Sequence, residues 1–342
     1  MSSMNARRTV ASAKKTACKC IGASMRMIAV QLLPAVTFVG INVAFARAGA
    51  AQQSQLSDPA FDPSVTRPAY QVGSGPRVGF DEAHHNFHTT TGRYKAFADL
   101  LTRDGFRLST NRDRLSDQVL RSYDLLVIAN ALGASDPGDA AASSAAFTEN
   151  EATALAAWVR GGGALLLISD HQPAGAAAQI LATQFGVRMS NATVVDTTVA
   201  NHLEGHFETN LEFTRANGLL KQHAITDGRD STERVDRVVA FGGQSLKGPA
   251  DAACLLALGP AGFEVRPPSR EKTAPLGDCM ALAFRFGRGH VVVTGEAAML
   301  SAQIVTEDGS SGTTHPWGMN WPGVDNRQLA LNIARWLSGA LH

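Results

Sequence analysis

A run of three glycines followed by five apolar residues constrains the fold of this chain more than any other stretch. Residues 161–163 end a helical segment and turn the chain, and Ala164–Ile168 then has the pattern of a strand buried on both faces. Strands of this kind occur in parallel sheets covered by helices. The run stops at Ser169, Asp170 and His171, where the strand should emerge from the core. Because ligands bind beyond the carboxyl ends of strands in open α/β sheets, Asp170 and His171 are candidates for functional residues.

Segments with strand and helix patterns alternate along the rest of the chain. Short apolar runs between residues 77 and 129 are separated by apolar residues at helical spacing, and Thr148 with Glu151 has the spacing of a capping box. This alternation predicts an α/β fold of the flavodoxin-like, doubly wound type, with a mostly parallel sheet and helices on both faces. The segment 281–294, with glycines at its middle, predicts a late β-hairpin.

Residues 1–50 have the pattern of a secretory signal peptide with an extended basic leader. Residues 28–46 are almost entirely apolar, lysines and arginines precede them, and small residues follow. The alternative is a transmembrane anchor, because the run is nearly long enough to span a bilayer, although Pro34 weakens it. Cleavage predicts a periplasmic or secreted protein, in which 51–75 is a linker or irregular arm and 76–342 is a single domain.

The composition excludes some classes of partner. The formal net charge is only +1, which argues against a general nucleic-acid binder. Aromatic residues make up 6% of the chain, so a stacking surface for single strands is not expected either. The expected partner is a small-molecule ligand, with membrane contact only through an uncleaved signal segment. The sequence leaves the oligomeric state open.

Cys254 and Cys279 are the two cysteines outside the predicted leader. Export makes a disulfide between them possible, and two separate buried thiols are the equal alternative. Neither cysteine lies in a C-x-x-C spacing, which argues against a zinc ribbon.

Polar side chains follow three of the predicted strands, at the point where each strand ends. Histidines and carboxylates gathered there suit either an acid–base pair or a divalent metal such as zinc. His84 and His88 are four residues apart, so on a helical turn they would share a face and could bind such an ion. We predict catalytic roles for Asp81, Asp170, His171 and Glu296, substrate contacts for Glu82, Asn86 and Asn130, and metal binding by His84 and His88.

Several of these residues also have a structural alternative. Asp81 could cap the next helix, His84 and His88 could be hydrogen-bonded loop residues, and Asp170 with His171 could be a local pair that closes a turn. A geometric expectation separates the two interpretations. If the three strands are parallel neighbours, then Asp81, Asp170 and Glu296 line one cleft, and mutual repulsion raises the pKa of at least one carboxyl.

Four motifs follow one another along the chain: the strand to Asp81 with the polar segment 82–88, Trp158 with the glycines and the strand to His171, the turn 223–228, and the strand 287–295 followed by a helix ending at Trp336-Leu337. In this order they resemble the class I glutamine amidotransferase-like superfamily, and within it the ThuA-like and DUF4350-type branches. The resemblance implies the flavodoxin-like fold over roughly residues 76–339. It departs from the family at one point: members that hydrolyse glutamine place a cysteine after the central strand, where this chain has Ser169 flanked by no glycine. Cysteine-dependent glutaminase activity is therefore not expected, and Ser169 is a poor substitute nucleophile.

Three functions fit these observations. The first is an exported hydrolase-like enzyme for a small polar compound containing carbohydrate or amide groups. The second is a non-catalytic ligand-binding module on the same fold, because a fold does not determine a function. The third is a structural role in an envelope complex.

Overall fold

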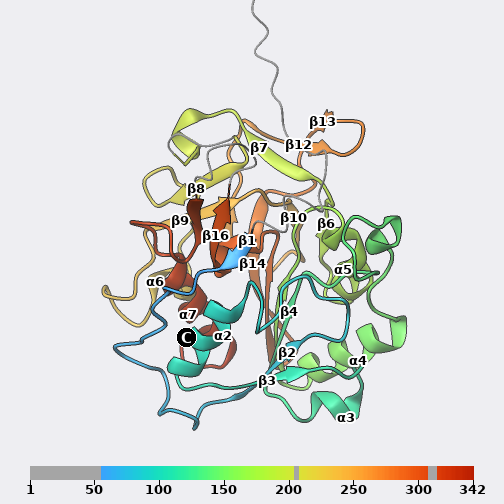
Figure 1. Ribbon diagram of the computed structural model, residues 1–342, viewed down its shortest axis with the longest axis vertical. Coiled ribbons are helices and arrows are strands. Elements are labelled where there is room, and N and C mark those ends of the chain that lie inside the picture. Colours follow the sequence, from blue (N-terminus) through green and yellow to red (C-terminus); the bar gives the residue numbers. More distant parts are fainter. Residues whose placement is uncertain (1–54, 204–207, 307–313) are drawn as a thin grey trace, which may run out of the picture. The chain divides into compact units, whose positions relative to one another are not determined.

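The computed structural model describes residues 55–203, 208–306 and 314–342 (Figure 1). The predicted signal peptide and its basic leader lie outside these ranges, as does the start of the predicted linker. Within the ranges, no helix has both the length and the apolar character that crossing a membrane requires.

The largest sheet of the described chain is mixed. Its first five strands, in the order β3–β2–β4–β5–β15, pair in parallel, and the strands beyond β15 pair antiparallel. The expected mostly parallel sheet therefore describes only the half that contains the central strand. In spatial order the strands are β3 (Arg107–Asn111), β2 (Arg77–Asp81), β4 (Leu125–Ala129), β5 (Ala164–Ile168), β15 (Gly289–Thr294), β14 (Cys279–Phe286), β10 (Leu246–Lys247) and β6 (Arg188–Met189), and β11 (Ala253–Ala257) also pairs with β14.

Strands β14 and β15 follow one another directly and pair antiparallel, from Ala281 opposite Thr294 to Phe286 opposite Gly289. Gly287 takes a positive φ of 62° at the first turn position, which glycine adopts without the steric cost of a Cβ atom.

Helices cover both faces of this sheet (Figure 1). Successive side chains of β4 point to opposite faces of the sheet and so enter two different cores. Val127 packs into the core that contains Phe97 and Ile333, and Ile128 packs into the core that contains Leu155. One face carries α2 (Lys95–Arg103) and α7 (Asn326–Leu337), and the other carries α3 (Asp117–Leu120), α4 (Glu149–Arg160) and α5 (Ala174–Gln184).

Helix α4 begins at the predicted capping box. The Glu151 backbone N–H donates to Thr148 Oγ1 at 3.3 Å, and Glu151 Oε2 accepts from the Thr148 backbone N–H at 3.0 Å. The helix ends at Gly161, and Gly162 follows with a φ of 119° that turns the chain into β5. The local sequence therefore sets both ends of this helix and the start of the central strand.

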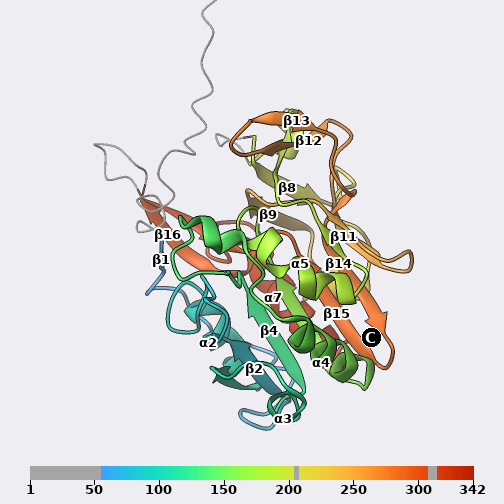
Figure 2. The same cartoon turned by 90° about the vertical axis from the view of Figure 1, so that its right-hand side faces the viewer.

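Smaller sheets complete the described chain, and Figure 2 shows β12 beside β13 and β1 beside β16. One sheet has the order β1–β16–β17, a second β13–β12–β7, and a third pairs β8 with β9. The remaining elements are β1 (Gln55–Ser57), β7 (Thr193–Asp196), β8 (Asn210–Thr214), α6 (Ala224–Asp227), β9 (Arg237–Phe241), β12 (Gly262–Arg266), β13 (Glu271–Thr273), β16 (Ala302–Thr306), β17 (Thr314–Gly318) and the 3₁₀ turns Ala140–Ser143, Val199–Asn201 and Ala298–Leu300.

The described part of the segment 51–75 packs on the domain. Strand β1 pairs antiparallel with β16, and Phe61, Val65 and Tyr70 pack against the larger core. The segment therefore contributes to folding, since its apolar side chains are partly removed from water.

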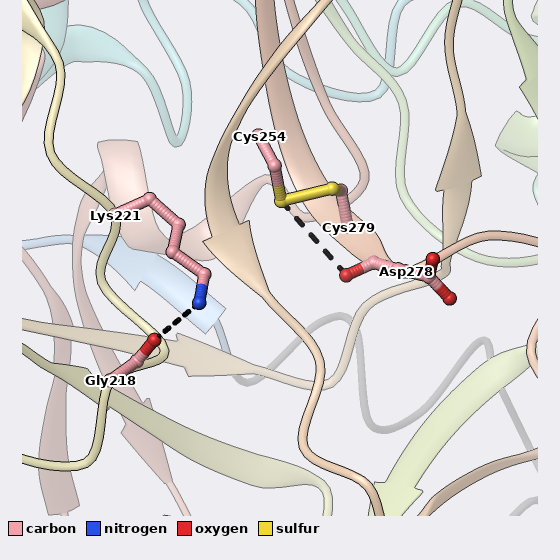
Figure 3. Close-up of a disulfide and its surroundings, with 5 residues drawn as sticks. All are labelled: Gly218, Lys221, Cys254, Asp278 and Cys279. Carbon is pink, nitrogen blue, oxygen red and sulfur yellow. Dashed lines mark hydrogen bonds between the residues drawn. A yellow bond between two sulfur atoms is a disulfide. The ribbon is translucent and has the colours of Figure 1, made fainter.

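Cys254 and Cys279 form a disulfide, which decides between the two alternatives that the sequence left open (Figure 3). It joins β11 to the first residue of β14, which are already paired as neighbours in the sheet. The loop that it closes, of sequence separation 25, contains β12 and β13.

Candidate functional site

Asp170 and Glu296 meet beyond the carboxyl ends of two neighbouring strands. Strands β5 and β15 are parallel, with Ile168 opposite Thr294, so the residues two positions further on emerge at the same edge. The Glu296 carboxylate is fully buried and accepts the backbone N–H groups of Ala298 and Met299, both at 2.7 Å. The Asp170 carboxylate accepts the backbone N–H of Ala297. The two carboxylates therefore share one backbone turn.

Burial and mutual repulsion both act on these carboxyls. Burial raises the pKa of Asp170, against the lowering effects of the His171 charge and of the His171 and Ala297 backbone N–H groups. Burial, and then the charge of Asp170, raise the pKa of Glu296 well above its ordinary value, against the lowering effect of backbone hydrogen bonds. Two carboxyls in this relation do not both ionise readily, so the pair retains a proton at a pH where isolated carboxyls have lost theirs.

Tyr94 lies against this pair, although no sequence pattern marked it as a site residue. Its hydroxyl donates to the Ala297 carbonyl at 2.6 Å, and burial, Glu296 and Asp170 together raise its pKa. The His88 ring stacks on Tyr94 with the ring centroids 4.8 Å apart. Burial and the nearby Arg93 charge lower the pKa of His88 to about 3, so its imidazole is neutral. The tyrosine was missed because its helical spacing with Phe97 and Leu100 matches that of a core residue.

His171 lies at the exposed side of Asp170, and 36% of its side chain is accessible. Its backbone N–H donates to Asp170 Oδ1 at 2.8 Å, and its ring Nδ1 lies 2.9 Å from the Gln172 carbonyl. The ring Nε2 is 3.8 Å from Asp170 Oδ1. This is the predicted local pair, and it leaves the imidazole accessible to a ligand.

Two other residues fix the Asp170 backbone. The Asp170 N–H donates to Asn130 Oδ1 at 2.9 Å, and Asn130 itself has a positive φ of 46°. Gln244 Nε2 donates to the carbonyls of Ser169 and Asp170, at 2.9 and 2.7 Å. Gln244 lies 74 residues from Asp170, and no sequence pattern indicated the contact.

Asp81 forms its hydrogen bonds with residues outside the Asp170–Glu296 pair. This corrects the expectation that Asp81, Asp170 and Glu296 line one cleft. Asp81 Oδ2 lies 2.8 Å from His84 Nδ1, and its Oδ1 accepts from Asn111 Nδ2 at 3.1 Å. The other ring nitrogen of His84 lies 2.9 Å from Glu151 Oε1. Burial alone would lower the pKa of His84, but hydrogen bonds and charges from Asp81 and Glu151 raise it above its ordinary value. Asp81, His84 and Glu151 therefore form a buried clamp between the end of β2 and the start of α4.

The residues predicted to contact substrate make hydrogen bonds within the chain. Glu82 Oε1 accepts the backbone N–H and the hydroxyl of Thr90, both at 2.8 Å. Asn86 Oδ1 accepts the His84 N–H at 3.0 Å, and Asn130 supports Asp170. These side chains support the loops around the candidate site through hydrogen bonds within the chain.

Across the described ranges, no three His, Cys, Asp or Glu side chains are arranged to hold a metal ion. The segment 84–88 is not helical, so His84 and His88 do not share a helical face. His84 is held between two carboxylates, and His88 stacks on Tyr94. The predicted two-histidine ligand set is therefore not formed by this arrangement.

Ser169 does not have the geometry of a nucleophile elbow. Its hydroxyl is buried and has no hydrogen-bond partner among the described residues. Ser169 is also absent from the few non-glycine residues of these ranges that take a positive φ, whereas an elbow is a sharp, strained turn.

A groove of about 920 Å³ lies among loops that follow β2 and β4 and strand β1. The Arg93 guanidinium lies over the Phe87 ring, 4.1 Å from its centroid, and both side chains line the groove. His88 follows Phe87 directly, so one wall of the groove belongs to the segment that also contacts Tyr94. The lining residues are Gln55, Leu56, Ser57, Phe87, Thr89, Thr91, Gly92, Arg93, Ser135, Asp136 and Pro137.

No protein-family model matches the chain, and no curated protein matches it. Among solved structures, the mmIFT52 N-terminal domain is similar, with 15% identity and a TM-score of 0.55 over 76% of this chain and 97% of that one. A protein described as ThuA-like from Parabacteroides merdae ATCC 43184 has 12% identity and a TM-score of 0.42, over 78% of this chain and 90% of that one. A protein described as part of a GMP synthase from Thermoplasma acidophilum has 12% identity and a TM-score of 0.35, over 76% and 94%. The first likeness shows the fold alone, and nothing further follows from the other two.

Proposed function

We propose that this chain is an exported hydrolase-like enzyme that acts on a small polar compound containing carbohydrate or amide groups. Asp170, Glu296 and His171 form its acid–base site, and Tyr94 supports them. The proposal includes the finer family assignment: a flavodoxin-like, doubly wound member of the ThuA-like or DUF4350-type branch that lacks a cysteine nucleophile.

One observation carries the proposal, namely the pairing of Asp170 and Glu296 on the turn 297–299. A general acid works best when its pKa lies near the pH of the reaction, and burial beside a second carboxyl is a standard way to raise it. The Asp170 side chain is 20% exposed and can reach a substrate, whereas Glu296 is fully buried and acts through Asp170. In this scheme a water molecule forms the new bond to the substrate, the imidazole of His171 accepts the proton of that water, and Asp170 donates a proton to the leaving group as its bond breaks.

Two features support export and the absence of thiol chemistry. The apolar run 28–46 has signal-peptide character, and the Cys254–Cys279 disulfide is typical of proteins in an oxidising compartment. The position after the central strand is Ser169, and both cysteines of the described chain are joined to each other. A cysteine-dependent glutaminase is therefore not proposed.

The second candidate is a non-catalytic ligand-binding module, including one within an envelope complex. The observation that favours it is the saturation of Asp81, Glu82 and Asn86 by contacts within the chain, which leaves few polar groups to orient a substrate.

Turnover and ligand binding separate the two candidates. Purified protein is first screened by thermal shift against sugars, glycosides and small amides, and compounds that raise Tm are tested for hydrolysis. We expect Asp170→Asn to retain ligand binding and lose about 10²-fold or more in rate, while the exposed control Asp117→Asn keeps wild-type activity. Wild-type protein that binds a compound without turning it over would support the binding module instead. Metal analysis of the same sample tests for a bound ion, and stoichiometric zinc or manganese would favour an enzyme.

A further inference from the structure

A second cavity, of about 370 Å³, lies between helix α7 and the arm that precedes β2. Arg327, Leu331 and Arg335 line it from α7, and they recur at four-residue intervals, which places them on one helical face. Val65 and Arg67 line it from the arm. None of its lining residues belongs to the acid–base site or to the larger groove.

Arg335 is buried and hydrogen-bonded, but one of its N–H donors lacks a hydrogen-bond acceptor among the described residues. It is 1% exposed, and its Nε and Nη2 donate to the two oxygens of Asp104 at 2.8 and 2.7 Å. Its Nη2 also donates to the Arg67 carbonyl at 3.1 Å. Its Nη1 lies 3.1 Å from Glu233 Oε2 without hydrogen-bond geometry, and no acceptor among the described residues satisfies it.

Arg327 has the same feature on the same face. Its Nη2 donates to the Ser64 carbonyl, and its buried Nε has no acceptor within the described chain. Glu233, the acidic residue of the lining, already accepts from Arg229 at both carboxylate oxygens. One N–H donor of each arginine therefore has no hydrogen-bond acceptor among the described residues, although Arg335 Nη1 keeps an ion-pair contact with Glu233. Buried polar groups are normally hydrogen-bonded.

We infer that this cavity binds a small organic acid, with its carboxylate on the guanidinium groups of Arg327 and Arg335 and its short apolar part against Val65 and Leu331. A carboxylate offers several lone pairs to buried N–H donors, and charge-assisted bonds of this kind are among the stronger ones in proteins. The volume lies near the lower end of the range of about 300–1,000 Å³ for small-molecule sites, which suits a ligand of a few carbon atoms. Val65 and Leu331 give the cavity an apolar wall beside its arginines. An inorganic ion has no apolar part to contact that wall.

The test uses the full chain and compares butanoate with butanamide, its neutral analogue, and with inorganic phosphate, at constant ionic strength. We expect butanoate to raise Tm and to bind with one-to-one stoichiometry in calorimetry, and we expect butanamide to bind at least about 10-fold more weakly. Phosphate should bind more weakly than butanoate, because it has no apolar part.

Variants assign the site. Arg327→Gln should weaken butanoate binding about 10-fold or more, and Arg327→Lys, which keeps the charge but loses the planar donor, should weaken it as well. Arg188→Gln, at an exposed arginine outside the cavity, should leave the Kd unchanged. Equal binding of butanoate and butanamide, tighter binding of phosphate, unchanged binding by both folded Arg327 variants, or no binding of any probe (water only) would each overturn the assignment. If Arg327→Gln fails to fold, the lysine variant and the butanamide comparison still decide.

Discussion

Asp170 and Glu296 accept hydrogen bonds from consecutive N–H groups of a single turn: Ala297 donates to Asp170, and Ala298 and Met299 donate to Glu296. The turn therefore holds two carboxyls together at the edge of the parallel strands. Backbone N–H groups stabilise the ionised form of each carboxyl, while burial and their mutual repulsion oppose it. Burial and repulsion therefore lower the stability of the folded protein when both carboxyls are ionised. This effect on the free energy of unfolding can be measured.

We expect Asp170→Asn to stabilise the protein at neutral and alkaline pH. A carboxyl whose pKa is higher in the folded than in the unfolded state must lose its proton at a cost to the folded state. The free energy of unfolding therefore falls as the pH rises from the unfolded pKa, near 4, through the folded pKa. Removal of Asp170 removes the repulsion on Glu296, so the free energy of unfolding at pH 8 should rise by about 1 kcal/mol or more, since one pKa unit corresponds to about 1.4 kcal/mol. Urea unfolding at pH 4, 6 and 8 measures the effect, which should vanish at pH 4. Asp117→Asn is the control, and an Asp170→Asn variant that is equally destabilised at all three values would contradict the prediction.

The clamp of Asp81, His84 and Glu151 predicts the opposite pH dependence. A histidine whose folded pKa is raised contributes stability that is fully present below its unfolded pKa, near 6.5, and is lost as the pH rises through the folded pKa. His84→Ala leaves two buried carboxylates without their cation and should cost about 3–5 kcal/mol at pH 6. His85→Asn, at the exposed neighbour, should cost little, because asparagine tolerates the positive φ of 49° found there. Denaturant unfolding of both variants at pH 6 and 9 is the measurement, and a similar cost for both variants would rule out the clamp.

The disulfide predicts a redox-dependent stability. A loop with a sequence separation of 25 should lose about 3 kcal/mol on reduction, by the chain-entropy scale. Peptide mapping without reductant should recover Cys254 and Cys279 in one linked species. Free thiols at both positions in unreduced, freshly purified protein would remove the bridge and one support for export.

The apolar run 28–46 remains a prediction of cleavage. N-terminal sequencing of protein recovered from the exported fraction should give a first residue between 47 and 52. A membrane-bound chain that still begins before residue 28 would show that the run acts as an anchor.

The sequence predicted local features better than distant pairings. The bounds of β5 and the capping box of α4 were predicted correctly because each depends on a few adjacent residues. Apart from the segment 281–294, the antiparallel half of the sheet was not predicted, because strands such as β10 and β6 have two residues each and acquire their register only from distant partners. Among the site residues, the neighbourhood of Asp170 and Glu296 follows from strand order. The contact between His84 and Glu151 could not be predicted in this way. Glu151 is 67 residues away, and its position in the sequence indicated only a helix cap.

Tyr94 provides the test of whether the turn around Ala297 positions Asp170. Its hydroxyl donates to the Ala297 carbonyl, and the N–H of the same residue serves the Asp170 carboxylate. Tyr94→Phe keeps the ring that stacks on His88 and removes only the hydroxyl, so it should cost about 1 kcal/mol or slightly more in stability. If the hydroxyl also holds the turn, loss of the Ala297 N–H bond should raise the pKa of Asp170 further, as read from the pH titration of its carboxyl carbon by NMR.

A second tyrosine supplies a matched control for that experiment. The Tyr70 hydroxyl donates to Ser338 Oγ at 3.0 Å, so Tyr70→Phe loses a comparable hydrogen bond elsewhere in the domain. Both variants should lose similar stability, but only Tyr94→Phe should shift the Asp170 titration. An unchanged Asp170 titration in a folded Tyr94→Phe variant would assign Tyr94 to packing alone. The Asp170–Glu296 pair would survive that result, because its own backbone hydrogen bonds do not depend on the tyrosine hydroxyl.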